Sequence, residues 1–169
     1  MSKIILKKLL LSTLIATSSI SAFAGKPVFQ VAIVKDAIAS NDIVKGDVES
    51  GLKKLTARAK TNNSYDKKMG LCVAYLQSNN SQSSESACTE AINSIDELAL
   101  NTKKALYLKS LNYSNRGVSR YKNADFDGAL SDFSTAVSID NNATTENNLA
   151  FIRQIMSDMK VESTAQLSD

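Results

Sequence analysis

The sequence has no histidine and no tryptophan among its 169 residues. The chain therefore has no histidine-dependent catalytic triad, no imidazole acid or base, and no zinc site with an imidazole ligand. Its six glycines are scattered singly, so it also lacks a glycine-rich loop of the kind that binds phosphate. These absences remove a large share of familiar enzyme chemistry.

Residues that interrupt helices are also rare. Pro27 is the one proline in the sequence, so clusters of Asn, Ser and Asp divide the chain into helix-sized pieces. Within those pieces apolar residues recur at spacings of three and four, which predicts an all-α fold of antiparallel helical hairpins. The run of β-branched residues at 28–34 could instead form a β-strand at the start of the domain, although a single strand would have no partner. The expected helices lie near residues 30–44, 47–60, 64–78, 83–97, 102–122, 126–139 and 144–160.

The first 24 residues have the composition of a secretory signal. Lys3, Lys7 and Lys8 precede an uncharged apolar stretch that ends in Ala22-x-Ala24, and the segment contains no acidic residue. A membrane anchor or a buried helix is the alternative, but roughly 12 apolar residues are too few to span ~30 Å of hydrocarbon. We expect residues 1–24 to be cleaved and the product to be periplasmic or secreted, without a stable membrane anchor.

Export gives the two cysteines, Cys72 and Cys88, a specific meaning. An even pair in an oxidising compartment is usually bridged, whereas the same pair in the cytosol would be free thiols. We therefore predict a disulfide. A redox-active pair is the weaker alternative, because the chain has no Cys-x-x-Cys motif to lower a thiol pKa.

The clearest internal pattern lies at residues 110–143. Gly117 and Ala129 would let two antiparallel helices approach closely, and Phe133 would fill the seam beside them. Tyr113 and Ala136 extend the same pattern, and the run resembles a tetratricopeptide repeat (TPR) over its whole length. It departs from the family where Tyr113 replaces the usual tryptophan and where an asparagine, residue 141, replaces the usual terminal proline.

Two weaker copies of this pattern precede it. The first places residues 38–39, Gly51 and Leu55 at the repeat positions, and the second uses Gly70, Ser84, Cys88 and Ala91 with two extra residues in its turn. The resemblance implies one helical domain at residues 25–160, stacked as a short superhelix. The last apolar segment would serve as a capping helix, and residues 161–169 would form a flexible tail.

The resemblance also implies a partner-binding groove, because the first helix of each repeat lines the concave surface in such arrays. Carried onto the best copy, the groove residues are Leu111, Ser114, Val118, Tyr121 and Lys122. The second copy contributes Lys67, Leu71 and Ala74, and the first contributes Asp36 and Ser40. The lysine-and-asparagine clamp with which some members hold a C-terminal carboxylate is not reproduced.

These features favour an exported protein-binding or scaffolding module that recognises a protein or peptide partner in the cell envelope, with a homodimer as a further option. A secreted helical bundle of structural or regulatory role, without a groove, is the alternative. No cofactor or metal is expected. Nucleic-acid binding is not expected either, because Tyr65 is the one aromatic residue among the basic residues between 53 and 68.

A hydrolase is the most distant alternative. Ser-x-x-Lys occurs at residues 50–53 and 157–160, which is the spacing of a serine-lysine nucleophile pair, but no companion motif follows. Asp125, Asp127 and Asp132 could form paired carboxylates. The first two fall in a turn between helices and Asp132 is expected on an exposed helical position, so we do not expect an enzyme.

Overall fold

The computed structural model describes residues 28–57, 65–97 and 102–166. Within these ranges the chain forms seven α-helices and no β-strand, so the all-α prediction is confirmed. The predicted signal segment, residues 1–24, lies outside the described residues. The helices are α1 (Ser40–Val44), α2 (Val48–Ala57), α3 (Tyr65–Gln77), α4 (Ser81–Glu97), α5 (Lys103–Lys122), α6 (Phe126–Ile139) and α7 (Ala143–Gln166).

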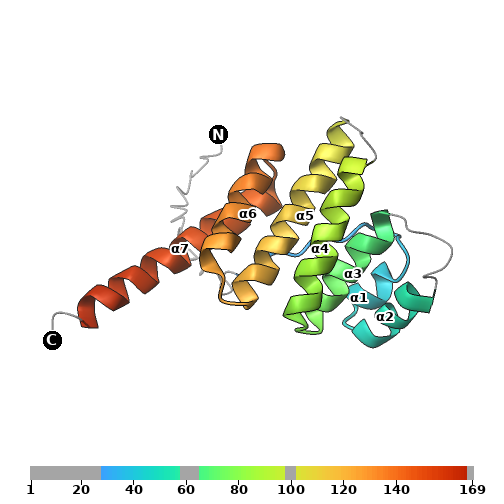
Figure 1. Cartoon of the computed structure of the whole chain (residues 1–169), viewed down its shortest axis with the longest axis horizontal. Helices are drawn as coiled ribbons and strands as arrows, with labels where there is room; N and C mark the ends of the chain where they lie inside the picture. The colour runs from blue at the N-terminus through green and yellow to red at the C-terminus, as the bar shows by residue number, and fades with distance from the viewer. Residues whose placement is uncertain (1–27, 58–64, 98–101, 167–169) are drawn as a thin grey trace, which may run out of the picture.

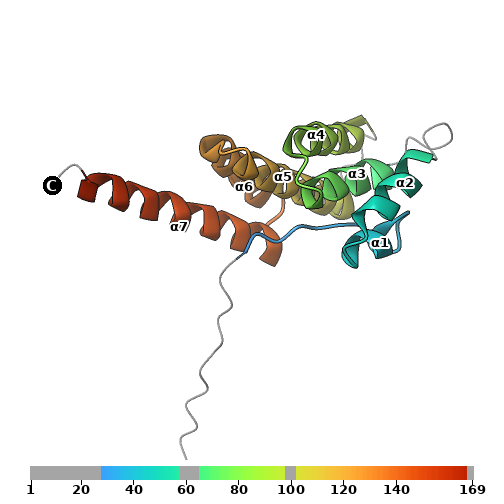
Figure 2. The ribbon, with the colours of Figure 1, turned by 90° about the horizontal axis from the view of Figure 1, so that it is seen from below.

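Helices that follow one another pack as neighbours, and the hairpins α3–α4 and α5–α6 form the centre of the molecule (Figure 1). α3 also contacts α1 and α5, and α5 also contacts α7, so the odd-numbered helices lie next to one another. Residues 28–34 run as an extended chain along this row of helices, from the start of α7 toward α1 (Figure 2).

The predicted first helix, residues 30–44, is wrong over most of its length. Only Ser40–Val44 is helical, and residues 28–39 are extended or in turns. The β-branched residues of this stretch favour extended backbone, because their χ1 freedom is restricted in a helix. The backbone N–H and C=O groups of this stretch do not need a helix to be hydrogen-bonded, since side chains from α5 and α7 bond to them, as described below.

Three hairpin turns share one geometry. The φ angles of Gly46, Asn79 and Ala124 are positive, at 84°, 56° and 61° respectively. Each of these residues lies two positions after the end of a helix. The next residue in each turn, Asp47, Asn80 or Asp125, accepts through its side chain a hydrogen bond from the backbone N–H three positions on. Such an acceptor satisfies one of the free N–H groups at the start of a helix. The three hairpins α1–α2, α3–α4 and α5–α6 are therefore built in the same register.

This register corrects the alignment of the second copy. Counted from its turn, the counterpart of Gly117 is Cys72 and the counterpart of Phe133 is Cys88, with no inserted residues. A Cβ on Gly117 would lie 2.8 Å from the Phe133 ring, which confirms the predicted close packing there. Gly70, by contrast, faces Leu55 of α2 and does not occupy the repeat position assigned to it.

The disulfide joins the same two positions in the second hairpin. Cys72 of α3 and Cys88 of α4 form an S–S bond, with their Cα atoms 4.6 Å apart, which confirms the predicted bridge. Both cysteines are fully buried in the largest apolar cluster, which also contains Val118, Phe133 and Ile152. The predicted packing residues Ala91, Ala129 and Ala136 are fully buried too.

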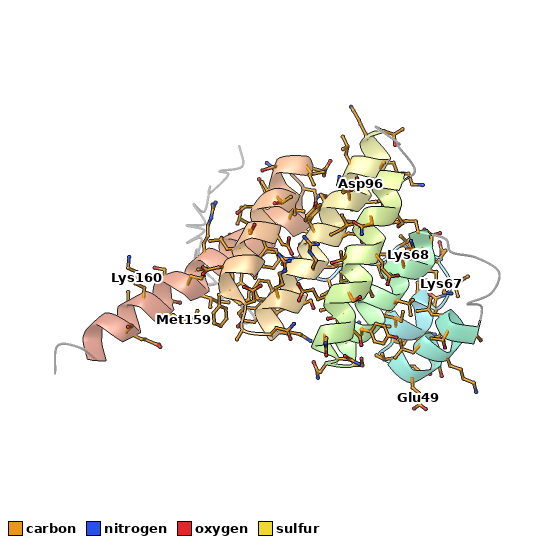
Figure 3. The ribbon with its side chains drawn as sticks, viewed as in Figure 1. Glu49, Lys67, Lys68, Asp96, Met159 and Lys160 are labelled. Carbon is orange, nitrogen blue, oxygen red and sulfur yellow. A yellow bond between two sulfur atoms is a disulfide. The ribbon has the colours of Figure 1, made fainter. Side chains whose placement is uncertain are left out.

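The last helix is longer than predicted. α7 ends at Gln166 and not near residue 160, so residues 161–166 of the expected tail are helical. No glycine or proline follows Ala143 to stop the helix. Leu149 and Ile152 pack into the largest cluster, whereas Met159 and Lys160 are exposed on the part of α7 that extends away from the other helices (Figure 3).

Because the turns at Gly46 and Ala124 have the same left-handed backbone, we expect Gly46→Ala and Ala124→Gly to change the stability of the protein in opposite directions. A Cβ on Gly46 would meet nothing within 4 Å, so Gly46→Ala tests only the left-handed backbone. We expect it to lower the free energy of unfolding by about 1 kcal/mol. Ala124→Gly relieves the same strain and should raise that free energy by about 0.5 kcal/mol, because the added freedom of the unfolded chain offsets part of the gain. Urea unfolding of both variants measures this, and equal signs for the two changes would contradict it.

Candidate functional site

Residues 28–34, which we call the strap, lie against the residues that the sequence assigned to a groove. Phe29 packs on the cluster containing Val118, Ile33 packs on the cluster containing Ala74, and Val34 packs on the cluster containing Leu111. The strap therefore contacts three apolar clusters along its length. It occupies the surface where the resemblance placed a partner.

Asn148 of α7 holds the strap at Gln30. The N–H of Gln30 donates to Oδ1 of Asn148 at 2.8 Å, and Nδ2 of Asn148 donates to the carbonyl oxygen of Gln30 at 2.8 Å. The same Nδ2 donates to Oγ of Ser114 on α5 at 2.8 Å, which orients the amide. Asn148 is fully buried, so these bonds replace water that the amide has lost.

Asn115 of α5 holds the strap in the same way two residues later. The N–H of Ala32 donates to Oδ1 of Asn115 at 2.9 Å, and Nδ2 of Asn115 donates to the carbonyl oxygen of Ala32 at 2.7 Å. Alternate residues of an extended chain present their backbone groups to the same side. The two buried asparagines contact residues 30 and 32, which are alternate residues of the chain. This spacing fits an extended main chain.

An aromatic cluster anchors the start of the strap. The ring of Phe29 lies 4.7 Å from that of Tyr121, 5.2 Å from that of Phe133 and 4.7 Å from that of Phe151, measured between centroids. These partners come from α5, α6 and α7. Aromatic pairs at such separations attract beyond the effect of buried area alone.

Two hollows flank this end of the strap. One, of about 370 Å³, lies between the strap and α7, and the other, of about 400 Å³, lies between the strap and α5. Val28 is 74% exposed and Val31 is 37% exposed, so the outer side of the strap faces solvent. The residues lining both hollows are Val28 and Phe151.

The predicted groove residues are brought together, but the surface is not open. Leu111, Ser114, Val118 and Ala74 are buried, and Leu71 and Tyr121 are half-buried against the strap's clusters. Val118 is only 3% exposed, so with the strap in place it offers no open face to a partner.

The charged and polar residues of the predicted groove do not contact the strap in the way that its apolar residues do. Lys122 donates to the carbonyl oxygen of Leu76 at 2.7 Å and to Oδ1 of Asn79 at 2.9 Å, so it caps the end of α3. Lys67 is half-buried near the start of α3 (Figure 3). Asp36 is exposed with a φ of 60°, and Ser40 is buried with no hydrogen bond to Oγ among the described residues.

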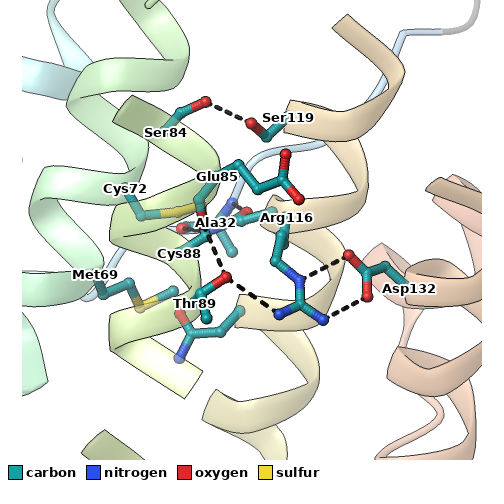
Figure 4. Close-up of a disulfide and its surroundings, with 12 residues drawn as sticks. Ala32, Met69, Cys72, Ser84, Glu85, Cys88, Thr89, Arg116, Ser119 and Asp132 are labelled. Atoms are coloured by element: carbon teal, nitrogen blue, oxygen red, sulfur yellow. Dashed lines mark hydrogen bonds and ion pairs between the residues drawn. A yellow bond between two sulfur atoms is a disulfide. The ribbon is translucent and has the colours of Figure 1, made fainter. Parts of the chain in front are cut away.

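A polar cluster joins α4, α5 and α6 beside the disulfide (Figure 4). Arg116 donates from Nε and Nη2 to the two carboxylate oxygens of Asp132, both at 2.8 Å, and from Nη1 to Thr89 at 3.2 Å. The hydrogen bond to Asp132 raises the pKa of Arg116, against the opposing effect of burial. Asp132 is 2% exposed, so its predicted exposed position is wrong. Its carboxylate serves an ion pair and is not free for catalysis.

The predicted residue Tyr113 and a second tyrosine, Tyr65, complete the contacts around α5. Tyr113 lies against the Arg116 guanidinium, 5.1 Å from ring centroid to Cζ. Tyr65 of α3 accepts a hydrogen bond from Nδ2 of Asn112 at 3.0 Å, and burial raises the pKa of the Tyr65 phenol. The phenol therefore stays protonated and links α3 to α5.

Of the residues considered for a hydrolase, Asp125 and Asp132 both lie within ion-pair distance of Arg120, so neither is a free carboxylate. Asp125 caps α6 through Gly128, and Asp127 is exposed in the first turn of that helix. The serine-lysine pair at residues 157–160 is exposed on the outer part of α7. Within the described ranges no group of three or more His, Cys, Asp or Glu residues is placed to hold a metal.

Sequence reasoning missed the two clamping asparagines. Asn115 lies between Leu111 and Val118 on the apolar side of α5, and Asn148 lies beside Leu149 on α7. An amide on an apolar helix face has to be hydrogen-bonded when buried. That signal could have marked both residues as binding side chains, although not what they bind.

Comparison with protein-family models, curated proteins and solved structures finds no match to this chain. Among the described helices, none has an apolar stretch sufficient to cross a membrane. The buried disulfide indicates a non-reducing, exported compartment. Because these comparisons find no match, a functional proposal has to rest on the geometry around the strap.

Proposed function

We propose that this chain is an exported TPR-like protein that binds a protein or peptide partner in the cell envelope by holding an extended segment of it against α5 and α7. The observation that carries this proposal is the pair of buried asparagines, Asn115 and Asn148. Each engages both the N–H and the C=O of one residue in an extended chain. Main-chain recognition of this kind is how many domains bind extended peptides.

The repeated hairpins support the TPR part of the proposal. The turns at Gly46 and Asn79 are 33 residues apart, close to the 34-residue period of the family. The turns at Asn79 and Ala124 are 45 residues apart, because α4 and α5 are long. The odd-numbered helices take the place of the first helix of each repeat, and these are the helices that line the groove in resembling arrays.

The compartment is also part of the proposal. The apolar, lysine-led residues 1–24 and the disulfide together favour a periplasmic or secreted protein. A scaffolding role in the envelope needs no cofactor, and nothing in the site calls for nucleic acid as a partner.

The experiment is photo-crosslinking in the native envelope. A photoreactive residue replaces Gln154, which is exposed and lines the hollow beside the strap. The test variant is Asn115→Leu/Asn148→Leu, which removes both clamps at similar side-chain volume. The matched control is Asn93→Leu/Asn141→Leu, at two exposed asparagines away from the strap. Circular dichroism establishes that both variants are folded.

We expect one partner to be captured by the wild type and by the control, and to be lost in the clamp variant. Capture that the clamp variant leaves unchanged would move the contact to another surface. If wild-type protein captures no protein at this position, the alternative of a secreted bundle without a groove replaces the proposal.

A further inference from the structure

The contacts of the strap separate into two kinds. The clamps bind only the main chain of Gln30 and Ala32, and the side chain of Gln30 is exposed. They therefore fix the direction and conformation of the bound chain but do not choose its sequence. Any selectivity has to come from the side chains that point into the protein.

Two strap side chains do so at this end of the site. Phe29 lies among three aromatic rings from three different helices, a setting that fits a planar apolar side chain. Ala32 packs against the buried cluster of Met69, Ala91 and Leu111 while its backbone is held by Asn115. The site therefore fits an aromatic residue and, three positions later, holds a small, half-buried one against a buried cluster.

The strap is bound in a way that permits its replacement. The chain leaves the strap through a turn in which Asp36 and Ala39 have φ values of 60° and 65°, a conformation that costs energy in residues with a Cβ. Hollows lie on both sides of its first residues, and its outer side is exposed. All the recorded contacts are non-covalent, and a separate chain of the same sequence could make each of them.

We propose that the strap is an exchangeable occupant and that the site beneath it selects, in a partner protein, an extended segment with an aromatic residue three positions before a small residue. This selectivity rests on the proposed function, in which the site serves a partner protein. The strap then competes with the partner, so that only a segment matching Phe29 and Ala32 displaces it.

The test starts from full-length protein that folds with its strap in place. A protease site replaces residues 35–37, which lie in the turn after the strap and are outside the clamps. After cleavage, the protein is mixed with a fluorescent, end-capped peptide of residues 28–35, and binding is followed by anisotropy. Circular dichroism reports whether the cleaved protein stays folded.

Five peptides separate side-chain from main-chain recognition. The parent peptide is compared with Phe29→Ala, with Gln30→Ala, and with versions N-methylated at Ala32 or at Val31. We expect 1:1 binding of the parent, and a loss of at least about tenfold for Phe29→Ala and for methylation at Ala32. The Gln30→Ala peptide should change affinity by less than about twofold, because Gln30 contributes only its backbone. Methylation at Val31 should also change affinity by less than about twofold, because the Val31 N–H is not among the backbone groups that the two asparagines bind.

Four results would overturn the proposal. Loss of the fold after cleavage, or a strap that never exchanges, would make the strap a fixed part of the core. Equal binding of the parent and Phe29→Ala peptides would remove the selectivity. Co-purification of two differently tagged uncleaved copies, abolished by Phe29→Ala, would make a second copy the occupant in place of a partner protein. Selective peptide exchange without any captured envelope protein would instead defeat the proposed function and leave the selectivity of the site standing.

Discussion

Replacing Asp132 by alanine is expected to lower the free energy of unfolding by about 3 kcal/mol, because breaking a buried ion pair leaves the remaining charge without compensation. Asp132 accepts two hydrogen bonds from Arg116 and forms a second ion pair with Arg120, whose Nη1 lies 3.2 Å from Oδ2. The Arg116 side chain is only 15% exposed, so water replaces little of what is lost. The measurement is chemical denaturation at neutral pH, with the slope of the transition checked for constancy.

The same helix offers a matched control for this prediction. Asp127 is exposed in the first turn of α6, and Asp127→Ala should cost less than about 1 kcal/mol. The double variant Arg116→Met/Asp132→Leu should recover most of the loss, because an apolar pair of similar volume leaves no buried charge. If Asp132→Ala cost no more than Asp127→Ala, the ion pair would not be the link between α5 and α6 that its geometry indicates.

Removing the disulfide is expected to have an effect of similar size. In the chain-entropy model, closing a loop of this length stabilises a protein by about 3 kcal/mol, so Cys72→Ala/Cys88→Ala should be less stable by about that amount. Alanine is preferred to serine because both positions are fully buried. For a protein of this size, a loss of 3 kcal/mol corresponds to a Tm lower by roughly 10 °C.

Comparison of oxidised and reduced protein checks the origin of that loss. Wild-type protein unfolded and refolded with reductant should match the Ala/Ala variant in its denaturation midpoint. The variant itself should not respond to reductant. Two free thiols in non-reduced protein from its native compartment, detected by mass spectrometry, would contradict both the bond and the compartment it indicates.

Features that depend on neighbouring residues in the chain were predictable. The spacing of Gly117, Ala129 and Phe133 identified a close helical hairpin, because helix period and side-chain size act within a few turns. The cysteine pair was predictable because an even pair that follows a secretory signal is usually bridged. The first copy, with Ala39 and Gly51 twelve apart, was placed in the register that the turns have.

The second copy shows where such reasoning fails. The sequence pattern favours Gly70 because glycine is the residue that close packing most often requires, but the position belongs to Cys72. The disulfide takes the place that Gly117 and Phe133 have in the third hairpin. A residue-type pattern cannot find a repeat position whose packing is achieved by different chemistry.

Six of the seven expected helices, the close hairpin and the cysteine bridge followed from local sequence, because each depends on residues a few turns apart. The strap, the burial of Asp132 and the covering of the predicted groove residues depended on tertiary structure. Residues 28–34 remain extended because Asn115 and Asn148, 83 and 118 residues away from Ala32 and Gln30, replace the backbone hydrogen bonds of a helix. Asp132 is buried because Arg116 lies opposite it on another helix. Whether a predicted groove is open or filled is decided only when distant segments meet, since the same apolar residues serve either state.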